Sequence, residues 1–134
     1  MKEIKKRSDC PISYALDFFG DKWSFLIIRD LAFKKRRFYK DFLNAEEGIA
    51  TNILSDRLKR LESIGVIKSK IFEELKTQKE YSLTKKGKDL IPILVEIILW
   101  SAKYDSDSAA SKDFVHQAKS DKEKLISSFY SNLS

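Results

Sequence analysis

The chain has 134 residues, 43% of them hydrophobic and 34% charged, which suits one folded domain with a sizeable core and excludes a disordered chain. Lysine and arginine outnumber the acidic residues by 26 to 20, and this net charge of +6 favours an anionic partner. The single cysteine excludes an intrachain disulfide and fits a reducing cytoplasm. No stretch resembles a signal peptide or is long enough to span a bilayer, so we expect a cytoplasmic protein with no membrane partner.

The N-terminal part of the chain predicts a basic arm followed by two helices. Residues 1–9 carry little apolar content. Residues 13–19 predict a short helix that Gly20 ends. Asp21 is predicted to cap a second helix over residues 22–33. The apolar stripe of this second helix is broad, which is typical of a central core helix.

Four consecutive cations occupy residues 34–37. Such a run is either a solvated loop or a set of phosphate contacts, and the residues alone leave both interpretations open. Residues 39–44 predict a short helix, and residues 44–48 predict a turn.

The most informative stretch covers residues 49–65, with the sequence IATNILSDRLKRLESIG. Leucines at positions 54, 58 and 61 recur at helical spacing, which predicts an amphipathic helix. Thr51 is predicted to cap its start, and Gly65 to supply the left-handed residue after its end. The opposite face is short and polar, which fits either a helix that only covers a core or one that binds a ligand.

A β-hairpin is predicted directly after this helix. Residues 66–72 and 79–83 read as strands, and residues 73–78 read as a charged turn between them. A helix followed by a two-stranded hairpin with lysines at its tip predicts a winged helix-turn-helix. The expected fold class is therefore mainly α-helical with a small β-hairpin wing.

The C-terminal part predicts two further helices. Thr84 is predicted to cap a helix over residues 85–104 that Pro92 should kink. The run from residue 94 to residue 100 is apolar on all sides of that helix. One domain of this size cannot easily cover it, so we expect a second copy of the chain to do so.

Residues 105–111 predict a polar linker, and residues 112–132 predict one last helix with an apolar face. This face could fold back on the core of its own chain, or it could pair with a second copy. In the second case it forms a predicted dimer interface together with the apolar run and Phe18 of the first helix. Its members are Phe18, Leu94, Ile97, Ile98, Trp100, Phe114, Leu125 and Phe129.

Five short motifs follow one another in a recognisable order. They are Asp9-Cys10-Pro11, Gly20-Asp21-Lys22-Trp23, Gly48-Ile49, the LSDRLKRLE run from residue 54, and YSLTKKG from residue 81. With this order and spacing, the chain resembles the HxlR-type winged helix regulators, a branch of the MarR-like set. The resemblance implies a homodimeric transcription regulator whose partner is double-stranded DNA. It implies an arm at 1–9, a DNA-binding domain at 10–104, and a linker with a dimerisation helix at 105–134.

The polar face of residues 49–65 offers side chains that can read bases in a major groove. Asn52 can bond adenine, Lys59 guanine or a phosphate, and Asp56 the N4 amino group of cytosine. Arg57 and Arg60 lie nearer the apolar stripe, where either can bond the DNA backbone or form an internal ion pair, and for Arg57 we expect the ion pair. The candidate DNA contacts are Lys35, Arg36, Arg37, Lys40, Thr51, Asn52, Ser55, Asp56, Lys59, Arg60, Lys76, Thr77, Gln78 and Lys79.

Two features depart from the family pattern. Family members often carry a basic residue where Phe38 stands, and the wing lacks the proline that many members have.

If the chain is a dimer, its operator should be a pseudo-palindrome with half-sites about 10 bp apart.

Catalysis finds little support in the sequence. The one histidine, His116, has no second ligand at metal spacing, so we expect no metal, no cofactor and no enzyme activity. The alternative to a regulator is a basic winged-helix module that binds a protein or an anionic membrane surface. A steep dependence of binding on salt would distinguish DNA binding from these alternatives.

Cys10 is either a packing residue or a sensor. Lone cysteines are more often buried and inert. Lys5, Lys6 and Arg7 could favour the reactive thiolate, and Pro11 is expected to delay the first helix. The resemblance implies a possible redox sensor here, since some HxlR-type regulators detect electrophiles or oxidants with a cysteine at this position. An oxidant or small-molecule inducer is then a further candidate partner.

Overall fold

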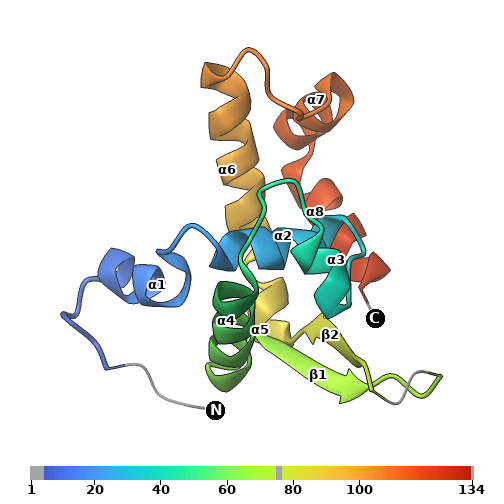
Figure 1. Cartoon of the computed structure of the whole chain (residues 1–134). Coiled ribbons are helices and arrows are strands. Elements are labelled where there is room, and N and C mark those ends of the chain that lie inside the picture. Colours follow the sequence, from blue (N-terminus) through green and yellow to red (C-terminus); the bar gives the residue numbers. More distant parts are fainter. Residues whose placement is uncertain (1–4, 75–76, 134) are drawn as a thin grey trace. The chain divides into compact units, whose positions relative to one another are not determined.

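The computed structural model describes residues 5–74 and 77–133. It divides into two compact units, Met1–Gly87 and Lys88–Ser134. Helices predominate in both units, and the strands of the described residues form one two-stranded antiparallel sheet (Figure 1). The predicted fold class, mainly α-helical with a small β-hairpin, is confirmed.

The first unit begins with helices α1 (Pro11–Phe19) and α2 (Ser24–Phe33). Helix α1 starts two residues earlier than predicted, because the fixed φ of Pro11 suits the first position of a helix. The second helix starts at Ser24, two residues later than predicted, and its N-cap is Trp23, so the expected cap is wrong. Asp21 nevertheless binds the backbone at the start of this helix. Its Oδ2 atom accepts hydrogen bonds from the backbone amides of Trp23 and Ser24, each at 3.1 Å. These bonds fix the start of α2, the helix with the most buried residues of this unit.

Helices α3 (Tyr39–Leu43) and α4 (Thr51–Ser63) form the predicted helix-turn-helix. The leucines of α4 are buried, and Gly65 is left-handed with φ +80°, as expected. The expected cap is wrong: Ala50 is the N-cap and Thr51 is the first helical residue, without a side-chain capping bond. The buried leucine face sets the rotation of α4 and turns its polar side to solvent.

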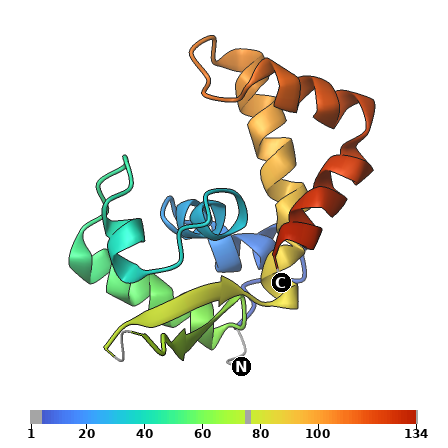
Figure 2. The same cartoon turned by 90° about the vertical axis from the view of Figure 1, so that its right-hand side faces the viewer.

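Strands β1 (Ile67–Ile71) and β2 (Lys79–Leu83) form the hairpin (Figure 2). In its register, Ile67 lies opposite Leu83. Tyr81 and Leu83 alternate inward on β2. Phe38, in the segment before α3, forms an isolated bridge with Glu80 of β2. The hairpin is therefore joined to the helix-turn-helix through backbone pairing as well as through its buried face.

Helix α5 (Lys85–Lys88) contains the last residues of the first unit, which ends at Gly87. The Thr84 hydroxyl accepts the amide of Gly87 at 3.1 Å, which confirms Thr84 as a cap. A Cβ atom on Gly87 would lie 2.2 Å from the Val66 carbonyl oxygen and 3.1 Å from a Leu83 methyl group. This close approach of backbone to backbone requires glycine.

The long helix predicted over residues 85–104 is wrong. The chain leaves helical geometry after Lys88, and α6 (Ile91–Tyr104) starts afresh in the second unit. Pro92 lies in the first turn of α6, where its missing N–H needs no partner, so it starts a helix instead of kinking one.

The single helix predicted over residues 112–132 is also wrong. Two helices, α7 (Lys112–Ser120) and α8 (Lys122–Asn132), take its place. Asp121 has a non-helical backbone, with φ −152° and ψ 78°, and its side chain accepts the amide of Lys124 at 3.1 Å. A capping aspartate that satisfies the first amides of a new helix explains the break.

In the second unit, α7 and α8 pack against each other and against α6. Figure 2 shows α7 leading away from the end of α6 and α8 returning towards its start. Ala118 and Leu125 are buried, and the rings of Phe114 and Phe129 lie 6.3 Å apart. The Tyr130 hydroxyl donates to Asp89 at 2.7 Å. Across residues 5–74 and 77–133, no helix combines the length and apolar character needed to cross a membrane.

Candidate nucleic-acid interface

The outer face of α4 carries the central part of the candidate surface. Its side chains at Thr51, Asn52, Ser55, Asp56 and Lys59 are all exposed, opposite the buried leucines. The predicted face is thus presented to solvent as one polar strip. It offers hydroxyl, amide, carboxylate and ammonium groups, which together can donate and accept hydrogen bonds.

Helix α3 holds the start of this strip. The Tyr39 hydroxyl lies 3.3 Å from the Thr51 carbonyl oxygen and 3.4 Å from the Ser55 hydroxyl. At the start of α3, the Asp41 carboxylate accepts the backbone amides of Arg37 and Phe38 at 3.1 and 3.0 Å. No local sequence pattern indicates this role of Tyr39, because its partners lie 12 and 16 residues further along the chain.

Arg57 forms the internal ion pair that was predicted. Its Nε atom lies 2.8 Å from Asp21 Oδ2, and its Nη1 atom contacts the Asp56 carboxylate at 2.5 Å. Burial alone would raise the pKa of Asp21. Hydrogen bonds from Ser24, Arg57 and two backbone amides outweigh burial and lower that pKa to about 2. Arg57 therefore ties α4 to the start of α2, and Asp56 is partly engaged by its neighbour.

Arg60 requires a correction. It was a candidate DNA contact, but its Nη2 atom donates to the Asp17 carbonyl of α1. Its Nη1 atom is buried and has no hydrogen-bond partner among the described residues. Arg60 points inward and joins α4 to α1, so we remove it from the candidate surface.

The cationic run at residues 34–37 divides into two pairs. Lys34 and Lys35 are exposed, and Lys35 adopts a left-handed backbone with φ +53°. Arg36 instead lies against Asp30 and Glu46, and Arg37 pairs with Glu80 of β2 at 2.7 Å. The two lysines remain candidate phosphate contacts, whereas the arginines are engaged within the protein.

A groove of about 480 Å³ lies between α3 and the hairpin. Lys40 of α3 and Lys79 of β2 are both exposed, and Thr77 and Gln78 continue the lining towards the hairpin tip. Phe38 and Tyr81 supply its apolar part. The groove combines cations with hydrogen-bonding groups, a combination that suits a phosphate backbone. Lys76, another candidate contact, lies outside the described residues.

The predicted dimer interface is only partly exposed. Phe18, Leu94 and Leu125 are buried within one chain, which corrects their place in the predicted interface. Phe114 and Phe129 face each other between α7 and α8, and Ile98 is half-buried. The apolar side chains that α6 leaves exposed are Ile93, Ile97, Trp100 and Tyr104.

Cys10 is exposed and is the N-cap residue of α1. Because Pro11 begins α1, the expectation that Pro11 delays this helix is wrong. Lys6 pairs with Asp9 at 3.5 Å, and Arg7 pairs with Asp17 at 3.0 Å. Two of the three cations expected near the sulfur are thus partly neutralised by carboxylates.

His116 is exposed on α7. In the part of the chain that the structure describes, no group of three or more histidine, cysteine or acidic side chains could hold a metal ion.

Known proteins match this arrangement. The model of the HxlR-like helix-turn-helix family covers residues 18–109. An uncharacterized HTH-type transcriptional regulator of Synechocystis sp., sll1512, is 38% identical over 86 residues, which are 64% of this chain and 63% of that protein. The chain thus spans slightly less than two thirds of that relative.

Solved structures agree with the family match. PA1607, described as a candidate transcription factor, has a TM-score of 0.69 and 39% identity over 79% of this chain and 72% of its own. The redox regulator HypR in its oxidized form has a TM-score of 0.62 and 26% identity, covering 70% of this chain and 96% of its own. With the family model spanning both the helix-turn-helix and α6, this chain belongs to the HxlR-like helix-turn-helix family of transcriptional regulators.

Proposed function

We propose that the protein binds duplex DNA in a sequence-specific manner, with α4 in the major groove and the hairpin on the adjacent backbone or minor groove. The observation that carries this proposal is the exposed polar strip of α4, at Asn52, Ser55, Asp56 and Lys59. Side chains on one face of a helix can meet base edges in a major groove. The lysines at positions 35, 40 and 79 are exposed and suit the phosphates on either side.

Fragments that the purified protein retains from its own genome provide the operator for the test. Asn52→Ala should cost about 1–3 kcal/mol on this operator and little on random DNA. Lys79→Ala should weaken both duplexes alike and reduce the salt slope by about 1. Equal losses on both duplexes for Asn52→Ala would show that α4 does not read bases. A flat salt dependence for the parent protein would favour the protein- or membrane-binding alternative.

We further propose a homodimer that uses the exposed apolar stripe of α6. Ile93, Ile97, Trp100 and Tyr104 follow one another at spacings of four, three and four residues, which places them on one side of the helix. Such a seam suits pairing with the same helix of a second copy. Trp100→Glu should convert a sedimenting dimer into a monomer, whereas a monomeric parent protein at micromolar concentration would contradict the proposal.

Cys10 remains a proposed redox sensor. Its exposure and its place at the N-cap of α1 support this role, as does the similarity to the redox regulator HypR. Operator affinity should fall after treatment with diamide or a quinone in the parent protein and stay constant in Cys10→Ser. An unchanged parent protein, or equal losses in both, would leave Cys10 a structural residue.

A further inference from the structure

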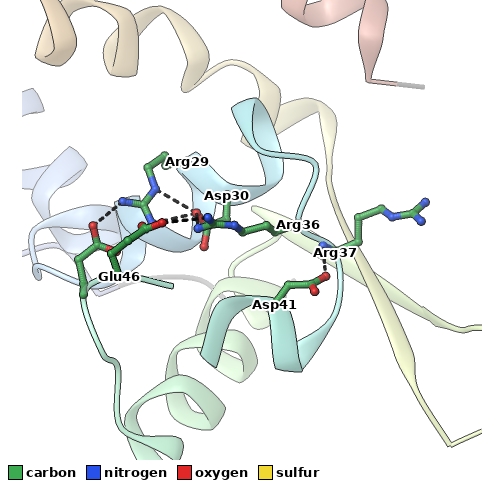
Figure 3. A network of polar contacts seen from close by, with 7 residues as sticks. Arg29, Asp30, Arg36, Arg37, Asp41 and Glu46 are labelled. Atoms are coloured by element: carbon green, nitrogen blue, oxygen red, sulfur yellow. Dashed lines mark hydrogen bonds and ion pairs between the residues drawn. The ribbon is translucent and has the colours of Figure 1, made fainter. Parts of the chain in front are cut away.

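Five charged side chains form a cluster between α2 and the turn that precedes α4. They are Arg29, Asp30, Arg36, Glu46 and Glu47, hereafter the Asp30 cluster. Figure 3 shows Arg29 and Arg36 converging on Asp30, with Glu46 beside them. Asp30 is only 2% exposed, and Glu46 and Glu47 are exposed at the turn.

Each arginine bridges the buried carboxylate and one carboxylate of the turn. Arg29 lies 3.0 Å from Asp30 through Nε and grips Glu47 with both terminal nitrogens, at 2.7 and 3.0 Å. Arg36 lies 3.1 Å from Asp30 and 3.2 Å from Glu46. Planar two-point pairing of a guanidinium with a carboxylate fixes orientation as well as distance.

The backbone of Asp30 adds hydrogen bonds to the same cluster. The Asp30 carbonyl accepts the amides of Lys34 and Arg36, at 3.2 and 3.1 Å. Burial raises the pKa of the Asp30 carboxyl group, and the two guanidinium groups oppose that shift. The C-terminal half of α2 thus carries a buried carboxylate whose charge is balanced by ion pairs with both arginines.

We propose that the Asp30 cluster positions the recognition helix, so that Glu47 and Glu46 are positioning residues for DNA reading. The inference rests on the proposed function of α4. The turn that these glutamates hold leads through Gly48, with φ +68°, and buried Ile49 directly into α4. A shift of this turn would move Asn52 relative to a base edge, while the phosphate contacts of flexible lysines would adjust.

Simple electrostatics makes the opposite prediction. The cluster contains three carboxylates and two guanidinium groups, so it carries excess negative charge in a basic protein. Removing a carboxylate near a DNA-binding surface should tighten binding to all DNA. If Glu47 positions α4, its removal should instead weaken operator binding specifically.

The experiment compares Glu47→Ala with Glu123→Ala, which removes the same charge from an exposed site on α8. The probes are the genomic fragment retained by the parent protein and a random duplex of equal length. Glu47→Ala should weaken operator binding roughly 10-fold and leave random DNA unchanged or tighter. Glu47→Gln keeps one acceptor for Arg29 and should recover part of the loss. Tighter binding of Glu47→Ala to both duplexes would overturn the proposal.

A second measurement separates this inference from the proposed function. Amide hydrogen exchange in the first two turns of α4, including the Leu54 amide bonded to the Ala50 carbonyl at 2.9 Å, should speed up in Glu47→Ala and not in Glu123→Ala. Unchanged exchange together with normal operator binding would overturn the positioning role. Faster exchange in a protein that never distinguishes operator from random DNA would support the role in holding α4 and contradict the proposed reading of bases. A thermal unfolding scan confirms that each variant is folded.

Discussion

Different kinds of contact stabilise the interior of each of the two units. In the first unit, arginines form bridges between elements: Arg29 and Arg36 through Asp30, and Arg57 through Asp21. In the second unit, α7 and α8 pack through Ala118, Leu125 and facing aromatic rings, with capping side chains at their starts. Both units have an apolar core, but the unit that presents the candidate DNA surface adds arginine bridges between its elements, whereas apolar packing and helix caps predominate in the unit with the exposed α6 stripe.

Arginine and lysine have different roles in the first unit. The arginines of the first unit are largely paired inside the protein, while Lys35, Lys40, Lys59 and Lys79 are exposed. A guanidinium can satisfy two carboxylates in fixed geometry, whereas an ammonium on a flexible stem suits a mobile phosphate backbone. A basic composition therefore serves both rigidity and ligand attraction, and only the lysines should affect binding to random DNA.

The largest expected effect on stability comes from the apolar packing of the second unit. Leu125→Ala removes a side chain that is 5% exposed, and the cavity left behind should cost about 2–4 kcal/mol. Because no charge is altered, the loss should be equal at low and high salt in urea unfolding. A loss that changes with salt would show that charges also hold this hairpin.

Asp21→Asn tests the charged contacts of the first unit. The substitution weakens the hydrogen bonds at the start of α2 and the pair with Arg57, and it should cost about 1–2 kcal/mol at neutral pH, a figure reduced because Asp21 is partly exposed. The pKa of Asp21 lies at about 2 in the folded protein against 3.8 ordinarily, so its contribution is complete above pH 4 and is lost as the pH falls through 2.

The measurement is the difference in unfolding free energy between the parent protein and Asp21→Asn from neutral pH down to pH 2. That difference should shrink below pH 4. Asp107→Asn, at an exposed site in the loop after α6, is the matched control and should show little difference at any pH. A difference for Asp21→Asn that stayed constant to pH 2 would contradict the lowered pKa.

Tyr130→Phe should cost about 1 kcal/mol, because it removes the hydroxyl that donates to Asp89. Burial and the Asp89 carboxylate raise the pKa of Tyr130 to about 12 from its ordinary 10. The contribution is therefore complete below pH 10 and declines as the pH rises towards 12. Chemical unfolding at pH 7 and pH 10.5 measures it, and an increase at the higher pH would be the wrong sign.

Lys35→Gly should give the smallest effect. Glycine accepts the left-handed backbone at this position, so stability should change by no more than about 1 kcal/mol, in the favourable direction. Binding to random DNA should weaken and its salt slope should fall by about 1. Unchanged binding to random DNA would show that Lys35 is only a solvated loop residue.

The pattern of α4 could be predicted well because one periodic stripe determines which side faces the core. The three leucines fixed the outer face, and Gly65 marked the end. The break at Asp121 could not, because a single capping aspartate in a polar stretch also fits the exposed side of a longer helix. The break after Lys88 could not either, because the N-cap of α6 is Leu90, which makes no side-chain capping bond that a sequence pattern could show. At such positions the local composition is the same for a helix that ends and for one that continues.

The arginines of the candidate surface were harder to predict than the lysines. The partner of Arg60 is the Asp17 carbonyl, 43 residues away in the chain, and Glu47 is 18 residues from Arg29. No local pattern records pairs of this kind. Only the fold brings these groups together, which is why the sequence did not exclude Arg36 and Arg60 as DNA contacts.

The close contact at Gly87 restricts which mutations the gene can tolerate at this position. Any side chain there would overlap the Val66 carbonyl oxygen at 2.2 Å, and backbone cannot swing aside as a flexible side chain can. In a library carrying every amino acid at each position, codon 87 should therefore tolerate glycine alone, even Gly87→Ala being depleted. Among close descendants of this gene, that codon should vary only at its silent third base.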